Sequence, residues 1–219
     1  MTNTLEKPAN EAERLNALKR YDILDSPPDG SFDHLTRLAA TLFNVPIAIV
    51  SLVDEDRIWF KSHFGIDAKQ IDRVPGLCAS AVLTNDIYIV ENAIEDPRTL
   101  ANPLVAGTMG LRFYAAAPLI TRDGYNLGTF CLIDRKQRYL TEAQREILQR
   151  LADIVMDEIE IRLSARQILN NTCNHLGNIV KEIDIMPDQP GMEKLKNLNS
   201  TSKKLIQTIK KQLQATSEI

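Results

Sequence analysis

The sequence predicts an α+β protein, in which helices pack on an antiparallel β-sheet and a long helix leads to a C-terminal helical hairpin. Three observations support this fold class. Helical periodicity precedes the first apolar strand-like run. Two pairs of strand-like segments, within 45–65 and 113–134, are each joined by a short polar link. From Thr141 the apolar spacing becomes helical, and no proline interrupts it before Pro187.

Two helices are predicted in the N-terminal region. In residues 10–21, apolar residues recur at helical spacing at Ala12, Leu15 and Leu18. The sequence SPPDG, residues 26–30, ends this region, because proline disfavours helical geometry in the residue before it and Asp-Gly favours a turn. A second helix is predicted over 32–43, and we expect a sheet to be covered by its apolar face, which comprises Leu35, Leu38, Ala39 and Leu42.

The first strand pair follows these helices. Residues 45–54, VPIAIVSLVD, are almost all aliphatic or β-branched, which favours a central strand buried on both faces. A short polar link, Glu55 and Asp56, leads to residues 57–65, in which Ile58 and Phe60 alternate with Trp59 and Lys61. The two segments are therefore predicted to pair antiparallel.

The second strand pair comprises 113–121 and 127–134, joined by a turn at Arg122, Asp123 and Gly124. Side chains alternate across a strand, so Cys131 shares one face with Thr129 and Ile133. Both faces are apolar or nearly so, and Cys131 is therefore predicted to serve packing rather than chemistry.

Residues 66–111 separate the two strand pairs and are mostly irregular. Only a short helix, 77–83, and a short strand, 87–91, are predicted there. Such a long irregular segment inside a compact domain usually has a function, such as covering a binding site.

The helix that begins near Thr141 is too long for a small domain. TEAQ, residues 141–144, has the form of a capping box. A helix continuing to Met186 would span roughly 70 Å at 1.5 Å per residue, so its second half must leave the core. That half carries a heptad seam of Leu169, Thr172, Leu176, Ile179, Ile183 and Met186.

The C-terminal residues complete a hairpin. PDQPG, residues 187–191, predicts a turn, and a similar seam resumes at Leu195, Leu198, Ser202, Leu205, Ile209 and Leu213. One seam buries too little surface to stabilise a lone hairpin, so two chains are expected to form a four-helix bundle and a homodimer. The predicted domains are 1–165 and the dimerisation hairpin 166–219.

Five blocks follow one another within residues 10–165: AERLNALKRYDILDSPPD, PIAIVSLVDEDRIWFKSHFG, LCASAVL, VENAIEDPRTLANPLV and GLRFYAAAPLITRDGYNLGTFCLID. In these blocks and in the order of its elements, the chain resembles the GAF family of small-molecule sensor domains. This resemblance implies a six-stranded antiparallel sheet with helices on both sides and a ligand cavity between the sheet and the irregular segment. The leading hypothesis is a non-enzymatic sensory module that binds a small molecule or senses redox state.

The cofactor chemistry of such domains finds little support in these residues. Phytochrome-like members attach a bilin to a cysteine before the last hairpin, but NPLVAGTMGLRFY contains none, which argues against covalent bilin. The motif of cyclic-nucleotide-binding members is also missing. Members that reduce free methionine sulfoxide use several cysteines, and here Cys131 and Cys173 are expected to lie too far from Cys78 to help it. No spacing suggests a metal site, and the cofactor is left open.

Six residues are predicted to line the ligand cavity. Trp59 and Tyr114 would form aromatic walls, and Arg112 would bind a carboxylate or phosphate. Ser80 and Asp96 would supply polar contacts, and Cys78 would supply a thiol. Three of them have structural alternatives: Arg112 pairs with Asp96, Asp96 caps a helix start, and Cys78 is a small buried apolar residue.

The C-terminal hairpin resembles the dimerisation and phosphoacceptor bundle of sensor histidine kinases, chiefly in EKLKNLNSTSKKLIQTIKKQL, residues 193–213. His175 would be the phosphoacceptor. In NHLGNIV, however, Leu176 stands where such kinases place Glu or Asp. The length leaves no room for an ATP-binding domain, so a complete kinase is not expected. A sensor-kinase or phosphorelay fragment using His175, and a thiol enzyme using Cys78, are the two alternative functions.

Composition narrows the partners. The chain has 219 residues and a net charge of −3, which gives no overall attraction to nucleic acid or an anionic membrane surface. It has no run as long as a membrane span and no apolar signal segment at its start. We therefore expect a soluble cytoplasmic protein that binds neither nucleic acid nor membrane and that signals to a partner protein.

Overall fold

The computed structural model describes residues 7–28, 30–186 and 191–215. The chain divides into two compact units, 1–159 and 160–219, and each is described by itself. Within the described ranges, no helix has the length and apolar character needed to cross a membrane.

The first unit is built on a six-stranded sheet in which all neighbouring strands are antiparallel, in the order β3-β2-β1-β6-β5-β4. The fold class predicted from the sequence is confirmed. The central strands of the sheet, β1 and β6, are buried at every position, as their apolar composition predicts. The six strands are β1 (Ile47–Val53), β2 (Arg57–Phe64), β3 (Gln70–Asp72), β4 (Tyr88–Val90), β5 (Phe113–Ile120) and β6 (Asn126–Asp134).

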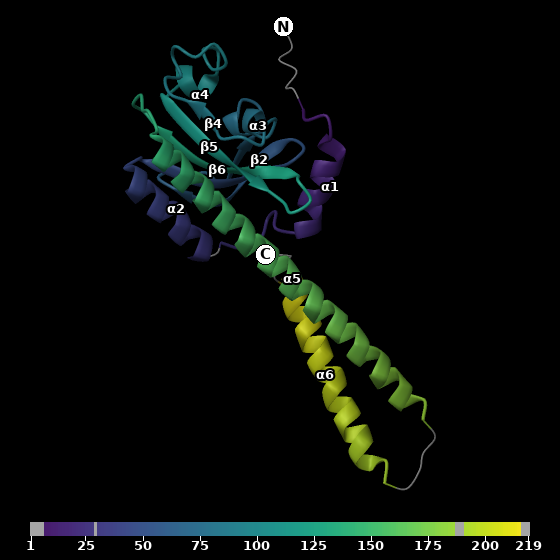
Figure 1. Ribbon diagram of the computed structural model, residues 1–219. Coiled ribbons are helices and arrows are strands. Elements are labelled where there is room, and N and C mark those ends of the chain that lie inside the picture. Colours follow the sequence, from purple (N-terminus) through teal and green to yellow (C-terminus); the bar gives the residue numbers. More distant parts are fainter. Residues whose placement is uncertain (1–6, 29, 187–190, 216–219) are drawn as a thin grey trace. The chain divides into compact units, whose positions relative to one another are not determined.

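Helices lie on both sides of this sheet (Figure 1). They are α1 (Glu11–Tyr21), α2 (Gly30–Phe43), α3 (Leu77–Ala81), α4 (Pro103–Ala106) and the first part of α5 (Glu142–Asp184). The predicted capping box is present, because Thr141 Oγ1 accepts from Gln144 N–H at 3.2 Å and Gln144 Oε1 accepts from Thr141 N–H at 3.0 Å. Asp29 of the predicted SPPDG turn lies outside the described residues.

The buried face of α2 differs from the predicted one. Leu38 and Leu42 are exposed, and the face in the interior comprises Phe32, Thr36, Ala39, Ala40 and Phe43. Small side chains let the helix approach the sheet closely, and Thr36 reaches Ser62 of β2 at 2.9 Å between their hydroxyl oxygens. Close approach and a hydrogen bond therefore outweigh the burial of larger leucines.

The two faces of β2 have different surroundings. Ile58 and Phe60 belong to the apolar cluster that includes α3. Trp59 and Lys61 point to the other face, where the Lys61 ammonium lies over the rings of Trp59 and Phe32 and donates to Ser26 and Pro27. Alternation along the strand thus decides which predicted site residues can reach α3.

Gly128 of β6 sets the spacing between the two central strands. It lies opposite Leu52 of β1, and a Cβ added there would come within 2.0 Å of the Ser51 carbonyl oxygen. Only glycine fits this approach. At the next register position, Ser51 lies opposite Thr129, and their hydroxyl oxygens are 2.9 Å apart in the interior of the unit.

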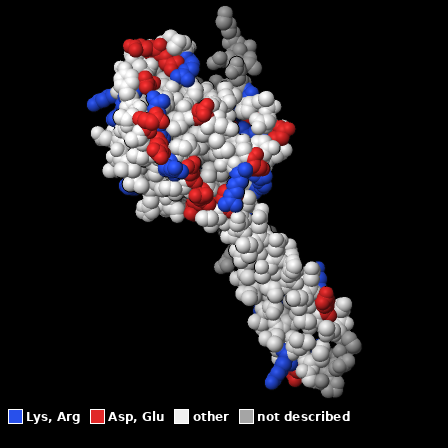
Figure 2. Space-filling model, in the orientation of Figure 1, with Lys and Arg blue, Asp and Glu red and all other residues white. Residues whose placement is uncertain are grey.

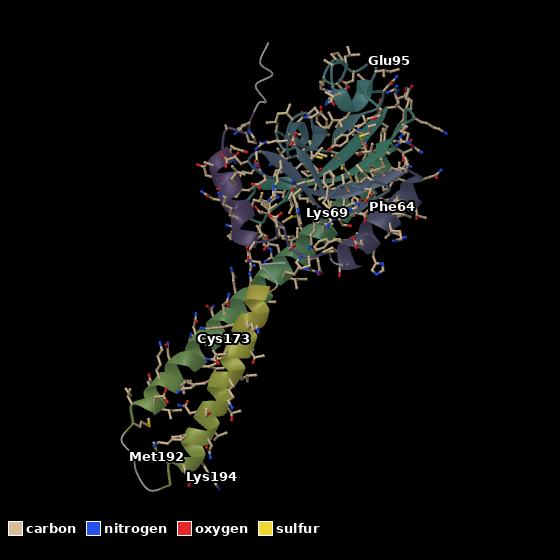
Figure 3. All side chains as sticks on the ribbon, turned by 180° about the vertical axis from the view of Figure 1, so that it is seen from behind. Phe64, Lys69, Glu95, Cys173, Met192 and Lys194 are labelled. Carbon is tan, nitrogen blue, oxygen red and sulfur yellow. The ribbon has the colours of Figure 1, made fainter. Side chains whose placement is uncertain are left out.

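The second unit is a hairpin formed by the rest of α5 and by α6 (Glu193–Ala215). Its small interior contains Cys173, Val180 and Ile206, with Ile209 packed against them, and Figure 3 labels Cys173 on α5. Buried Asn199 donates to the Val180 carbonyl and to Asp184, at 3.2 and 2.9 Å. Residues 187–190 of the predicted turn lie outside the described residues, as does the Leu213 side chain.

The predicted seams coincide only in part with the interior of this hairpin, to which Ile209 contributes. Five of their leucines and isoleucines are exposed: Leu169, Leu176, Ile179, Leu198 and Leu205. On α6, Asn199 and Ile206 occupy the interior positions expected for Leu198 and Leu205. A shift of one residue turns a helix face by about 100°, so the larger side chains face outward.

Candidate functional site

A small apolar cavity lies between the sheet and the irregular segment 66–111. Its volume is about 40 Å³. The walls come from β1, β2, β3, β5 and β6 on one side and from α3, α4 and their flanking loops on the other. The lining residues are Ile49, Phe60, Ile66, Ile71, Leu77, Cys78, Leu104, Met109, Leu111, Tyr114 and Ile133. This is the position that the resemblance predicted for a ligand cavity.

Two of the six predicted site residues, Cys78 and Tyr114, line this cavity. Cys78 is placed by α3, which begins at Leu77, and Tyr114 by β5. The Tyr114 hydroxyl donates to Cys78 Sγ at 3.2 Å, and both side chains are buried. This hydrogen bond therefore joins two residues that were predicted from the sequence to line the cavity.

The structure brings Cys131 to the same place. Cys131 of β6 is fully buried and belongs to the same apolar cluster as Cys78, close enough to affect the acidity of its thiol. Ser51 and Thr129, which hydrogen-bond to each other, lie near enough to lower the pKa of the Cys78 thiol. We call Cys78 and Cys131 the thiol pair.

The surroundings separate the acidities of the two thiols. The hydrogen bond from Cys131, with those from Ser51, Tyr114 and Thr129, holds the pKa of Cys78 below its ordinary value even though burial raises it. The same contact with Cys78, together with burial, raises the pKa of Cys131 well above its ordinary value. Burial also raises the pKa of Tyr114, which keeps its hydroxyl a donor. Cys78 is therefore the member of the pair that ionises first.

The other four predicted residues do not line the cavity. Trp59 lies on the opposite face of the sheet, for the reason of alternation given above. Ser80 of α3 is half-buried and outside the lining. Asp96 bonds to Arg98 through the backbone N–H at 2.9 Å and through an ion pair. Arg112 donates to the carbonyl oxygens of Val105 and Leu111, at 3.0 and 2.9 Å, and so holds the loop after α4.

The predicted alternative, in which Arg112 pairs with Asp96, is wrong. The two residues do not pair with each other, and each instead stabilises a local turn. Sequence reasoning missed Cys131, Ser51 and Thr129 as neighbours of Cys78. Strand alternation placed Cys131 and Thr129 on one face, but nothing in the sequence indicated which face α3 would cover.

His175 lies on the second unit. Its side chain is exposed on α5, one residue before Leu176. Within the part of the chain that the structure describes, no carboxylate forms a hydrogen bond or ion pair with His175, and its role as phosphoacceptor stays a prediction.

Comparison with known proteins identifies related sequences and folds. Residues 27–159 match the GAF domain family. Over 162 residues the chain is 36% identical to a cyclic di-GMP phosphodiesterase of Pseudomonas aeruginosa, a match that covers 74% of this chain and 28% of that protein. The chain therefore corresponds to much less than half of this relative.

Solved structures share the fold at low sequence identity. The GAF domain of a phosphoenolpyruvate-protein phosphotransferase from Acinetobacter has a TM-score of 0.52 and 18% identity, covering 73% of this chain and 95% of that one. The free methionine-R-sulfoxide reductase from Neisseria meningitidis has a TM-score of 0.52 and 17% identity, covering 75% and 99%. At these identities the likeness concerns the fold.

Proposed function

The chain belongs to the GAF domain family, and from that premise we propose that it is a non-enzymatic input module of a signalling protein. Its input is a chemical event in the cavity beside Cys78. Its output passes through helices that pair with those of a second chain. The observation that carries this proposal is that the buried thiol of Cys78 lies at the wall of an otherwise apolar cavity, with Cys131 buried close behind it.

The size of the cavity favours a very small input. Pockets for organic ligands have volumes of about 300–1,000 Å³, whereas this cavity has about 40 Å³. A water molecule needs about 10–15 Å³ on the same measure, so a molecule the size of hydrogen peroxide fits. An organic ligand requires movement of the segment that carries Leu104 and Met109. We therefore propose redox sensing as the first function of the cavity and ligand binding as the alternative.

The thiol pair can complete an oxidation without another protein group. The Cys78 thiolate attacks one oxygen of hydrogen peroxide, the O–O bond breaks, and protonation of the leaving oxygen releases water, which leaves a sulfenic acid. The Cys131 thiol then attacks the sulfenic sulfur, a disulfide forms, and a second water leaves with the thiol proton. Two thiols and one peroxide thus give one disulfide and two waters.

The output is assigned to the hairpin. Its outward seam residues include Leu176, Ile179, Leu198 and Leu205, and Figure 2 shows much of one hairpin face free of charged side chains. Exposed apolar rows on two adjacent helices suit pairing with an identical hairpin in a four-helix bundle. We propose that residues 166–219 form a homodimer and that an event at Cys78 changes its helix packing.

Native mass spectrometry of the reduced protein, before and after hydrogen peroxide, tests this proposal. The expected result is a dimer whose protomers each lose 2 Da on oxidation, with no such loss in Cys78→Ser or Cys131→Ser. A co-purified organic molecule would instead support ligand binding. A monomer would contradict the output, and a protein that keeps both thiols in peroxide would contradict the redox input.

The thiol pair also favours a second candidate, a thiol-based reductase that cycles between these two oxidation states. Turnover of free methionine sulfoxide with a dithiol reductant tests it. Multiple turnovers that Cys78→Ser abolishes would establish an enzyme. A single disulfide without turnover would leave the sensor proposal standing.

A phosphorelay role for His175 is tested separately by acid-labile phosphate. Exposure of the His175 side chain is the observation that supports it. Phosphate that is lost in His175→Gln would place the chain in a relay and would assign the hairpin a chemical role as well as a dimerisation role.

A further inference from the structure

A second cavity lies at the start of α1, away from the thiol pair. Its volume is about 420 Å³. Polar groups from three parts of the first unit line it: residues 8–10 with Arg14, the segment after α3, and the turn between β5 and β6, including Asn10, Thr84, Asn85 and Asn126. This is large enough for a small polar metabolite, whereas the cavity at Cys78 is not.

Arg14 is the unusual residue of this wall. It is only 1% exposed, and its Nη1 has no hydrogen-bond partner among the described residues. Its other donors are used: Nε and Nη2 bind the two carboxylate oxygens of Glu11 at 2.7 and 3.0 Å. A buried guanidinium N–H group is almost always paired in native proteins. We therefore expect Nη1 to have a partner that is not one of the described residues.

The local charge gives the sign of that partner. Arg73, which is also buried, shares the same Glu11 carboxylate, at 2.5 Å from Nη1 to Oε1, and its Nε and Nη2 are likewise unpaired among the described residues. One carboxylate therefore faces two guanidinium groups, which leaves an excess positive charge in a poorly solvated place. The attraction of both arginines holds the pKa of Glu11 below its ordinary value although burial opposes this, so Glu11 stays ionised and cannot neutralise more than one of them.

The backbone adds to this attraction. Residues 8–10 form the N-terminus of α1, an 11-residue helix whose N-cap residue Asn10 makes no side-chain capping bond. The first N–H groups of a helix and its dipole favour an anion. The cavity is thus lined both by a helix N-terminus and by the arginine that carries the unpaired guanidinium nitrogen.

We propose that this cavity binds a small oxyanion, a carboxylate or phosphate group, with Arg14 Nη1 as its anchor. The side-chain amides of Asn10 and Asn85 bind the remainder of the molecule. This site is separate from the input at Cys78 and does not depend on it.

Inorganic phosphate and acetate, added at constant ionic strength to ¹⁵N-labelled full-length protein, serve as probes. We expect saturable NMR shifts at the Arg14 Nε–H and at the side-chain amides of Asn10 and Asn85 for at least one of them. Arg14→Lys keeps the charge beside Glu11 but removes the fork, and should weaken binding at least tenfold. Arg20→Lys, on the same helix but exposed, is the matched control and should bind as wild type.

A second variant keeps the test decisive if Arg14→Lys does not fold. Asn85 is exposed, so Asn85→Asp leaves the interior unchanged and adds a negative charge at the cavity wall, and it should also weaken binding about tenfold. Shifts that rise linearly without saturating, or that are the same in Asn85→Asp and Arg20→Lys as in wild type, would overturn the proposal.

Discussion

The two units of the molecule treat their apolar residues in opposite ways. In the first unit, β1 and β6 are buried at every position, and the interior holds ionised groups as well. In the described part of the hairpin, the interior cluster has three buried residues, while larger side chains such as Leu198 and Leu205 are exposed. The first unit therefore encloses its own stabilising surface, and the second keeps most of its apolar surface available for another chain.

The largest effect that separates the units is expected from core truncation. Phe130→Ala removes a fully buried ring of β6 and should lower the free energy of unfolding by about 3–5 kcal/mol. The matched truncation in the hairpin, Leu198→Ala, should cost less than about 0.5 kcal/mol in a monomer, since Leu198 is 66% exposed. Urea unfolding followed by the fluorescence of Trp59, the single tryptophan, measures the first unit. Equal losses of unfolding free energy in Phe130→Ala and Leu198→Ala would contradict the difference between the two units.

The next effect concerns self-association. Leu176→Asp places a charge on the outward face of the hairpin and should weaken the proposed dimer by about 2 kcal/mol or more, roughly thirtyfold in Kd. Trp59 unfolding should not change. Sedimentation equilibrium measures the Kd, and Lys204→Gln is a control that also makes the net charge more negative by one, at an already polar position. If both variants dissociate the dimer equally, the effect is one of charge and the seam is not the interface.

A smaller effect is expected at the thiol pair. Tyr114→Phe removes the hydroxyl that donates to Cys78. It should lower the free energy of unfolding by about 0.5–1.5 kcal/mol. Loss of this donor also raises the pKa of Cys78, so less thiolate is present at neutral pH and peroxide oxidation slows. The rate of thiol loss, measured against pH, should shift its midpoint upward relative to wild type. Tyr88→Phe, the neighbouring ring in edge-on contact with Tyr114, should leave that midpoint unchanged.

The smallest effect comes from an exposed ion pair. Arg20 donates to Asp123 at 2.8 Å and thereby holds the pKa of this carboxyl below its usual range. A lowered pKa in the folded state adds stability above the ordinary carboxyl pKa, and this contribution is lost as the pH falls through the folded value. Both side chains are more than 40% exposed, so the pair should contribute only about 0.2–1 kcal/mol. A double-mutant cycle with Arg20→Gln and Asp123→Asn at pH 7 and pH 2 measures it. A coupling that is as large at pH 2 as at pH 7 would contradict the assignment.

The sequence predicted the elements with long or strongly periodic apolar spacing. The two strand pairs, α1 and the long helix were found because their periods are repeated many times. The three-residue β3 and the four-residue α4 were missed, since one turn or one strand pleat has no period to detect. The face of α2 was predicted wrongly because side-chain volume alone does not measure how closely a helix can approach a sheet.

Prediction of the site was limited by the same lack of tertiary information. Cys78 and Tyr114 were identified, and their contact joins α3 to β5. Trp59 was assigned to the wrong face, although its alternation with Phe60 was visible, because the side of the sheet covered by α3 is set by the chain path through 66–76. Arg14 and Arg73 gave no signal in the sequence. They are 59 positions apart, and only the fold brings both to Glu11.

Gly128 limits how this protein can change during evolution. Any side chain at this position would meet the Ser51 carbonyl oxygen, so a replacement must push the two central strands apart and with them the hydroxyl groups beside Cys78. A lineage that abandons the glycine would therefore alter the chemistry of the thiols without mutating either cysteine. Descendants can keep the cysteines and lose their reactivity, and the residue to inspect in them first is the glycine.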